Sequence, residues 1–524
     1  MDAVLTPAAD PVAGFAFDNS YARDLPGFYL PWKPAEAPAP RLLYLNRPLA
    51  AELGLDADAL AGEAGAALFA GNALPPGAQP IAQAYAGHQF GGFSPQLGDG
   101  RALLIGELID RHGRRRDVAF KGSGRTPFSR GGDGKAGVGP MLREVLIGEA
   151  MHALGIPTTR ALAVAATGEP VMRERALPGA VLTRIAASHL RVGTFQFFAA
   201  RGEWERLRQL ADYAIARHDP QLAGSPERYL GLLRAVAQRQ ADLIAQWMNV
   251  GFIHGVMNTD NMTISGETID YGPCAFMEAF DSAAVFSSID HGGRYAYGNQ
   301  PHIARWNLAR LGETLLPLLA RDTEDEAAVK EAVAQVTEVI DAFPDWYARA
   351  LLRGQRAKLG LLADAADAAD AADADAGDAA LADDWLALLQ AQAVDHTLAW
   401  RRLADAAQGD APELQALFAD GASLQAWLTR WRARCAQDDA AMATPDAAQA
   451  RAQRMRQVNP WIIPRNHRVE EALAAASDDN DLAPFEQLLE AVQHPFDDEA
   501  PQRGRYAEPA PAEVTACYQT FCGT

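Results

Sequence analysis

Cysteine is scarce in this chain, basic residues are outnumbered by acidic ones, and long apolar runs are missing. Four of the 524 residues are cysteines and none forms a CxxC pair, which argues against a disulfide framework and against structural zinc. No run of about 18 apolar residues occurs, so we expect no membrane-spanning helix. The N-terminus lacks the basic and apolar segments of a secretion signal. We therefore expect a cytoplasmic protein that works without a membrane.

The charge balance excludes a further class of protein. The 47 Lys and Arg residues face 67 Asp and Glu residues, which gives a net charge of −20, whereas nucleic-acid binding needs clustered basic residues. Any nucleotide must therefore be held locally. Hydrophobic residues make up 49% of the chain and charged residues 22%, as in soluble globular proteins. The length indicates about two to four structural units.

The most informative segment has the layout of a kinase catalytic and metal-binding loop. The kinase pattern H-R-D-L-x-x-x-N places a catalytic carboxylate two residues after the His and a metal-binding amide five residues later. Here His254 is followed by Val256 at the carboxylate position, whereas Asn261 keeps the amide. Asp270 takes the place of the metal-binding Asp of D-F-G. Ordinary phosphoryl transfer is thus in doubt, and the neighbouring carboxylate of Asp260 is a candidate base for different chemistry.

The elements before this loop have the order of a kinase N-lobe. Strands are predicted at 101–107 and 118–120, and a helix from 138 to 153. Lys121 at a strand end and Glu144 on the helix have the order of the kinase ion pair that positions a lysine on nucleotide phosphates. We therefore predict an α+β, protein-kinase-like two-lobed fold with an N-terminal arm and a helical C-terminal extension.

Composition divides the chain further. Residues 1–75, rich in Pro and aromatics, are predicted to form an arm packed on the body, followed by an N-lobe at 76–190 and a C-lobe with the catalytic loop at 191–345. Residues 346–524 form a mainly helical extension. It contains an Ala/Asp-rich insert at 363–380, for which an acidic surface helix or a disordered insert is expected.

Glycines and arginines supply further candidates. Gly98 and Gly100 belong to a predicted hairpin turn whose backbone N–H groups can also approach a phosphate, and Arg101 adds a forked donor. A second glycine loop carrying both charge signs contains Asp133 and Gly134; by itself it would be a flexible surface loop. Arg184 and Arg191 are either surface charges or part of a nucleotide cleft between the lobes.

Two cysteines are candidates for a redox link between the tail and the metal-binding turn. Cys274 follows that turn directly, and Cys522 lies near the C-terminus. Isolated cysteines more often fill apolar space without reacting. Both interpretations stay open.

Several motifs resemble those of the selenoprotein O family, also called YdiU. The similar segments are residues 85–93 (YAGHQFGGF), 97–101 (LGDGR), 120–127 (FKGSGRTP) and 258–273. The last residues, 518–524, are similar to bacterial members, which have Cys where some eukaryotic relatives carry selenocysteine. The resemblance covers nearly the whole chain apart from the Ala/Asp-rich insert.

This resemblance implies a protein adenylyltransferase of kinase-like fold. Such an enzyme binds ATP in an inverted orientation and moves AMP to Ser, Thr or Tyr hydroxyls of proteins. It implies Asp260 as the proton acceptor, Asn261 and Asp270 as ligands of Mg²⁺ or Mn²⁺, and ATP and protein substrates as partners. We expect a bacterial protein that is a monomer. The implied nucleotide contacts are Gly98, Gly100, Arg101, Lys121, Asp133, Gly134, Arg184, Arg191 and Asp270.

Two alternatives remain. The first is a kinase for a protein or a small molecule that uses Asp260 as base with ATP bound in the usual way, and Val256 argues against it. The second is a silent pseudokinase that binds ATP and serves as a scaffold. The intact set of Lys121, Asn261 and Asp270 argues against that, because a scaffold needs no complete metal site.

Overall fold

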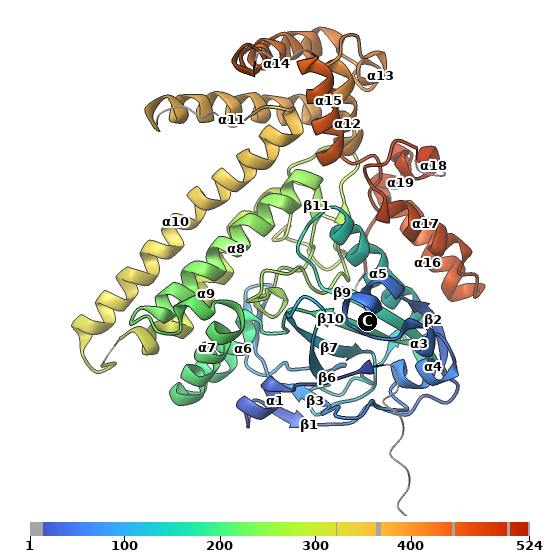
Figure 1. Ribbon diagram of the computed structural model, residues 1–524, viewed down its shortest axis with the longest axis vertical. Coiled ribbons are helices and arrows are strands. Elements are labelled where there is room, and N and C mark those ends of the chain that lie inside the picture. The colour runs from blue at the N-terminus through green and yellow to red at the C-terminus, as the bar shows by residue number, and fades with distance from the viewer. Residues whose placement is uncertain (1–13, 321, 363–367, 443–445, 500–502, 522–524) are drawn as a thin grey trace, which may run out of the picture.

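An antiparallel sheet of eight strands forms the base of the molecule in Figure 1, and helices surround it. This computed structural model describes residues 14–320, 322–362, 368–442, 446–499 and 503–521. The strand order is β1-β3-β6-β7-β10-β9-β2, with β8 paired to β10. The strands are β1 (Tyr29–Pro31), β2 (Arg41–Leu45), β3 (Ile81–Gln83), β6 (Ala102–Ile109), β7 (Arg115–Lys121), β8 (Ala136–Gly137), β9 (Arg160–Met172) and β10 (Ala176–Ala186).

The segment before residue 76 contributes to this sheet. The sequence predicts it as an arm packed on the body, and the structure places β1 beside β3 and β2 at the opposite edge beside β9. The short helix α1 (Ser20–Asp24) precedes β1. Three more, α2 (Arg47–Glu52), α3 (Ala57–Leu60) and α4 (Glu63–Phe69), lie between β2 and β3. The predicted strands at 101–107 and 118–120 are confirmed as parts of β6 and β7.

The predicted helix from 138 to 153 is confirmed as α5 (Val138–Ala153). It is buried on most sides, because Leu142 and Val145 share a core with Val164 of the sheet and with Leu473 and Phe485 of the C-terminal helices. Those helices, α16 (Asn466–Asp478) and α17 (Ala483–Gln493), flank α5 in Figure 1. A helix covered in this way holds its side chains in place, which matters for Glu144.

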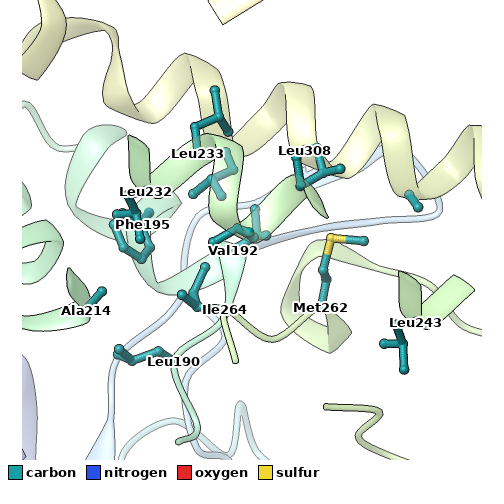
Figure 2. Packing of buried hydrophobic residues seen from close by; sticks show 14 of the residues in the cluster. Leu190, Val192, Phe195, Ala214, Leu232, Leu233, Leu243, Met262, Ile264 and Leu308 are labelled. Carbon is teal, nitrogen blue, oxygen red and sulfur yellow. The ribbon is translucent and has the colours of Figure 1, made fainter. Parts of the chain in front are cut away.

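A second group of helices packs against the residues at both ends of the catalytic loop. It comprises α6 (Val192–Ala199), α7 (Trp204–His218), α8 (Arg228–Val250), α9 (Gln300–Leu319) and α10 (Glu326–Leu359). Figure 2 shows their core, in which Met262 and Ile264 lie among Val192, Phe195 and Leu308. Because Met262 follows Asn261 directly and Ile264 comes two residues later, this core anchors the end of the catalytic loop. No helix among the described residues is long and apolar enough to cross a membrane.

The remaining elements complete the molecule. Short strands are β4 (Gly87–Gln89), β5 (Gly92–Ser94), β11 (Phe252–Ile253) and β12 (Ala275–Phe276). The C-terminal helices are α11 (Ala368–Ala391), α12 (His396–Ala406), α13 (Pro412–Gln415), α14 (Gly421–Met442), α15 (Ala447–Val458), α18 (Arg503–Ala507) and α19 (Ala512–Cys517). Helices α11 to α15 gather around Trp385, Trp400, Trp427 and Trp431.

The Ala/Asp-rich insert is helical where it is described. Residues 363–367 lie outside the described residues, and the rest of the insert belongs to α11. The prediction of a surface helix is wrong at Asp378, which is buried and accepts hydrogen bonds from Arg356 (2.7 Å) and Arg434 (2.7 Å). A buried carboxylate needs such partners, and composition alone does not reveal them.

Gly251 ends α8 immediately before the catalytic loop, and its replacement by Ala should destabilise the fold. Its φ of 72° lies in the left-handed region, and the Cβ of an alanine would lie 3.0 Å from Nδ1 of His396. We expect Gly251→Ala to lower the free energy of unfolding by about 1–3 kcal/mol, measured by urea denaturation. Gly377→Ala is the control: this exposed glycine lies inside α11 with open space around it, and alanine there should stabilise by about 0.5–1 kcal/mol. Equal changes in the free energy of unfolding for the two substitutions would contradict this prediction.

Candidate functional site

The residues that the sequence predicts for nucleotide binding and catalysis line a cavity of about 1240 Å³. Its walls come from the sheet, from the loop after α8 and from the C-terminal tail. It is lined by Gly98, Gly100, Arg101, Lys121, Asp133, Gly134, Glu144, Arg184, Arg191, Asp260, Asn261 and Asp270. A cavity of this size can hold a nucleotide together with part of a second substrate.

The predicted ion pair of Lys121 and Glu144 is confirmed. Lys121 Nζ donates to Glu144 Oε1 at 2.7 Å and to Asp270 Oδ1 at 2.8 Å. Arg184 Nη1 reaches the same Asp270 oxygen at 2.7 Å. Burial alone would raise the pKa of Asp270, but Lys121, Arg184 and Arg191 outweigh it and hold that pKa well below its usual value. Asp270 is thus a carboxylate at neutral pH, in contact with two cations.

Further backbone and ring contacts hold Asp270, Glu144 and Arg191 in place. Asp270 has a φ of 64°, an uncommon conformation for a residue with a side chain, and the next N–H, of Tyr271, donates to Glu144 Oε1 at 3.0 Å. The guanidinium of Arg191 lies 4.5 Å from the ring centroid of Tyr85. Its Nε is buried and has no hydrogen-bond partner among the described residues. A phosphate oxygen would satisfy this donor.

Asp260 lies across the cavity on the short turn Thr259–Asn261. The residue is only 8% exposed, and burial raises the pKa of its carboxyl to about 6, against the opposing effect of Arg191. Gln89 Nε2 donates to Oδ2 at 3.1 Å. Oδ1 is buried without a hydrogen-bond partner among the described residues. Asp260 therefore has one oxygen held by the protein and one that is able to accept a proton.

Val256 and Asn261 line the cavity together with Asp260. Val256 lines the cavity at the position where a kinase has its carboxylate, and its carbonyl accepts from Asn261 Nδ2 at 3.0 Å. This bond turns the amide nitrogen of Asn261 toward the loop. A cation would bind through the other amide atom, the oxygen. Among the described residues no group of three or more His, Cys, Asp or Glu side chains forms a metal cage, so phosphate oxygens would have to complete the coordination of any Mg²⁺.

The two glycine loops are ordered by close packing. At Gly98, whose φ is 71°, a Cβ would overlap the ring of Phe128. At Gly134, whose φ is 69°, it would overlap the backbone of Gly124. Asp133 is held by Arg173, with Nη1 at 2.8 Å from Oδ2. The side chain of Asp133 and the backbone of Gly134 are thus held in place, whereas Gly131 in the same loop is exposed and has open space around it, as expected for a surface loop.

The cysteine prediction is tested only in part. Cys274 is buried in the core and has no disulfide partner among the described residues, and burial raises the pKa of its thiol to about 12, as expected for a cysteine that fills apolar space. Cys522 lies outside the described residues. The nearby tail does approach this region, because Thr520 Oγ1 donates to the carbonyl of Pro273 at 2.8 Å. The redox link stays a prediction.

Sequence reasoning assigned no role to Gln89 and Gln196, which hold the catalytic loop, or to Asn258, a loop residue through which the loop is held. Thr259 Oγ1 donates to Gln196 Oε1 at 2.6 Å, and Asn258 Oδ1 accepts from the N–H of Phe90 at 3.1 Å. The only signal was that Gln89 and Asn258 belong to motifs of the resemblance. The pairing of these motifs becomes visible in three dimensions only.

Glu267, between the catalytic loop and Asp270, should make stability depend on pH. Its Oε2 accepts from the N–H of Ala187 at 2.8 Å. Burial raises its pKa from 4.5 to about 7, against the opposing effect of the Ala187 hydrogen bond and the Arg116 charge. The folded protein thus binds this proton more tightly than the unfolded chain does. The resulting stabilisation is complete below about pH 4.5 and is lost as the pH rises through about 7.

Glu267→Gln, which mimics the protonated acid, removes this dependence. We expect the free energy of unfolding of the variant relative to the wild type to rise by roughly 1–3 kcal/mol between pH 5 and pH 8. Urea denaturation at several pH values measures it. Glu490→Gln, on the exposed side of α17, serves as the control. A difference from the wild type that stays constant across this range would contradict the prediction.

Comparison with known proteins identifies the family of this chain. The family model described as "Protein adenylyltransferase SelO" matches residues 11–493. The chain is 62% identical over 511 residues to the protein nucleotidyltransferase YdiU of Cereibacter sphaeroides, covering 97% of this chain and 100% of the relative. It is 61% identical over 500 residues to that of Chromobacterium violaceum, covering 95% and 100%, and 56% identical over 513 residues to that of a Mycobacterium species, covering 98% and 100%. The chain therefore belongs to the SelO family of protein adenylyltransferases.

Proposed function

We propose that this protein transfers AMP from ATP to Ser, Thr or Tyr hydroxyls of other proteins and releases pyrophosphate. The observation that carries the proposal is the position of the candidate base, a carboxylate at Asp260 instead of at residue 256. Val256 occupies the kinase position, whereas the buried Asp260 lines the same cavity, and its Oδ1 has no hydrogen-bond partner among the described residues. The names of the family and of its curated relatives, which specify nucleotidyl transfer to protein, support it.

The fold that we propose for this activity is protein-kinase-like and two-lobed. The sheet with α5 supplies Lys121 and Glu144, and the helical group supplies Asn261 and Asp270. ATP lies between them, inverted relative to its orientation in a kinase. In that orientation the α-phosphate, not the γ-phosphate, lies nearest to Asp260.

The chemistry follows from the groups around the cavity. The acceptor hydroxyl oxygen attacks the α-phosphorus, and the bond from that phosphorus to the oxygen bridging to the β-phosphate breaks. The hydroxyl proton passes to the carboxylate of Asp260, and pyrophosphate leaves with the electron pair of the broken bond. Lys121, Arg184 and Arg191 stabilise the negative charge that builds on phosphate oxygens, which is the largest contribution in most such reactions.

Asn261 and Asp270 are the residues that would hold Mg²⁺ or Mn²⁺. An amide oxygen and a carboxylate suit a hard cation that keeps substrate phosphates as its other ligands. When bound, such an ion neutralises phosphate charge and orients the triphosphate. Asp270 is already ionised beside Lys121 and Arg184, so it needs no deprotonation to bind a cation.

The test is to supply ATP labelled at either the α- or the γ-phosphate, with Mg²⁺ and the soluble proteins of a bacterial lysate. We expect label in protein from the α-phosphate alone. Label from the γ-phosphate alone would make the protein a kinase and would refute the inverted orientation. Binding of ATP without transfer of either label would favour the scaffold.

A further inference from the structure

The β4–β5 hairpin holds the catalytic loop by three successive contacts. The N–H of His88 donates to Thr259 Oγ1 at 2.7 Å, Gln89 Nε2 donates to Asp260 Oδ2 at 3.1 Å, and the N–H of Phe90 donates to Asn258 Oδ1 at 3.1 Å. Consecutive residues of the hairpin thus bind three consecutive residues of the loop, 171 positions apart in two cases. This arrangement fixes the register between the two segments.

The hairpin also approaches the catalytic carboxylate directly. A Cβ at Gly87 would lie 2.6 Å from Asp260 Oδ1, so only glycine leaves room for that oxygen. The turn at its tip contains Phe90 with a φ of 51° and Gly91 with a φ of 86°, a pattern of two-residue hairpin turns. The strained residue Phe90 is held by a second bond, from its N–H to the Tyr295 hydroxyl at 3.1 Å. Strain held in this way is typical of functional sites.

The contacts differ in what they hold. His88 and Phe90 bind through backbone N–H groups to Thr259 and Asn258, and thereby place the loop as a whole. Gln89 uses its side chain, lines the cavity and reaches the Asp260 carboxylate itself. The torsion that rotates a carboxylate about its last bond is soft, so a fixed loop does not by itself fix the direction of Oδ1.

We propose that Gln89 is a positioning residue for Asp260 in adenylyl transfer. By holding Oδ2 it stops the carboxylate from rotating and keeps the whole group in the orientation in which it meets the acceptor hydroxyl, with Oδ1 packed beside Gly87 and without a hydrogen-bond partner among the described residues. This inference rests on the proposed function. Catalytic groups must be held close to their productive geometry, within about 0.5 Å.

Gln89→Leu removes the donor and keeps a side chain of similar size. With α-labelled ATP and lysate proteins as acceptors, we expect its maximal rate to fall roughly 100-fold, since small misplacements of a reacting group have that effect. The KM for ATP should stay within about twofold of the wild-type value, because Gln89 acts on the acceptor side. Gln89→Glu, which keeps the length but replaces the donor by an acceptor, should lose at least as much.

The matched control is Gln96→Leu, the same substitution at an exposed position just beyond the hairpin, with wild-type rates expected. A double mutant separates positioning from a structural role. In the Asp260→Asn background, Gln89→Leu should cause no further loss, because the group that it positions is gone. A multiplicative loss in the double mutant, or a Gln89→Leu variant as active as Gln96→Leu, would overturn the inference alone. A wild type that transfers no AMP would overturn the proposed function and the inference with it.

Discussion

Asp260→Asn is expected to reduce AMP transfer by about 10²–10⁴-fold while leaving ATP binding intact. The substitution keeps the shape of the side chain but removes the proton acceptor, and general-base catalysis contributes about that factor. ATP affinity should persist, because the predicted phosphate contacts of Lys121, Arg184 and Arg191 are unchanged. Initial rates with α-labelled ATP at pH 8, above the pKa of about 6 of Asp260, measure the first effect. Titration calorimetry measures the second.

The control for this prediction is Asp479→Asn. Asp479 is an exposed carboxylate at the end of α16 and does not line the cavity, so the same change of charge there should leave the rate unaltered. A fully active Asp260→Asn variant would show that another group accepts the proton. Loss of ATP binding together with activity would instead indicate a disturbed site, and thermal melting would detect that disturbance.

Much of the site was accessible from sequence because its signals are local. The helix at 138–153 follows from apolar spacing, and the pair of Lys121 and Glu144 follows from the order of strand and helix. The spacing from Asn261 to Asp270 likewise places both residues at one cavity. In each case a short stretch of chain determines where the side chain points.

The features that sequence did not reveal depend on contacts between distant segments. The bond from Gln89 to Asp260 joins positions 171 residues apart, and nothing in the hairpin's own pattern names its partner. Asp378 sits in a run of Ala and Asp that predicts exposure, but Arg356 and Arg434 from other helices bury it. Side-chain partners brought together by folding leave no periodicity to detect.

Replacement of Asp270, a proposed ligand of Mg²⁺, should also cause a large loss of AMP transfer. We expect Asp270→Asn to lower the rate of AMP transfer by at least about 10²–10³-fold, the loss typical when one stabilising group of a charged transition state is removed. The concentration of Mg²⁺ needed for half-maximal activity should rise as well, because a neutral amide binds a hard cation more weakly than a carboxylate does. Rates measured over a series of Mg²⁺ concentrations test both.

Asp270→Asn should not weaken the binding of ATP when no metal is present. Asp270 Oδ1 accepts from Lys121 at 2.8 Å and from Arg184 at 2.7 Å, and its loss leaves both buried cations short of an anion, which is costly. The phosphates of ATP can take its place. In the presence of a chelator, Asp270→Asn should therefore bind ATP at least as tightly as the wild type and should melt at a lower temperature when empty. Weaker metal-free binding in the variant would mean that Lys121 and Arg184 serve Asp270 alone and do not contact phosphate, which would contradict the roles assigned to them.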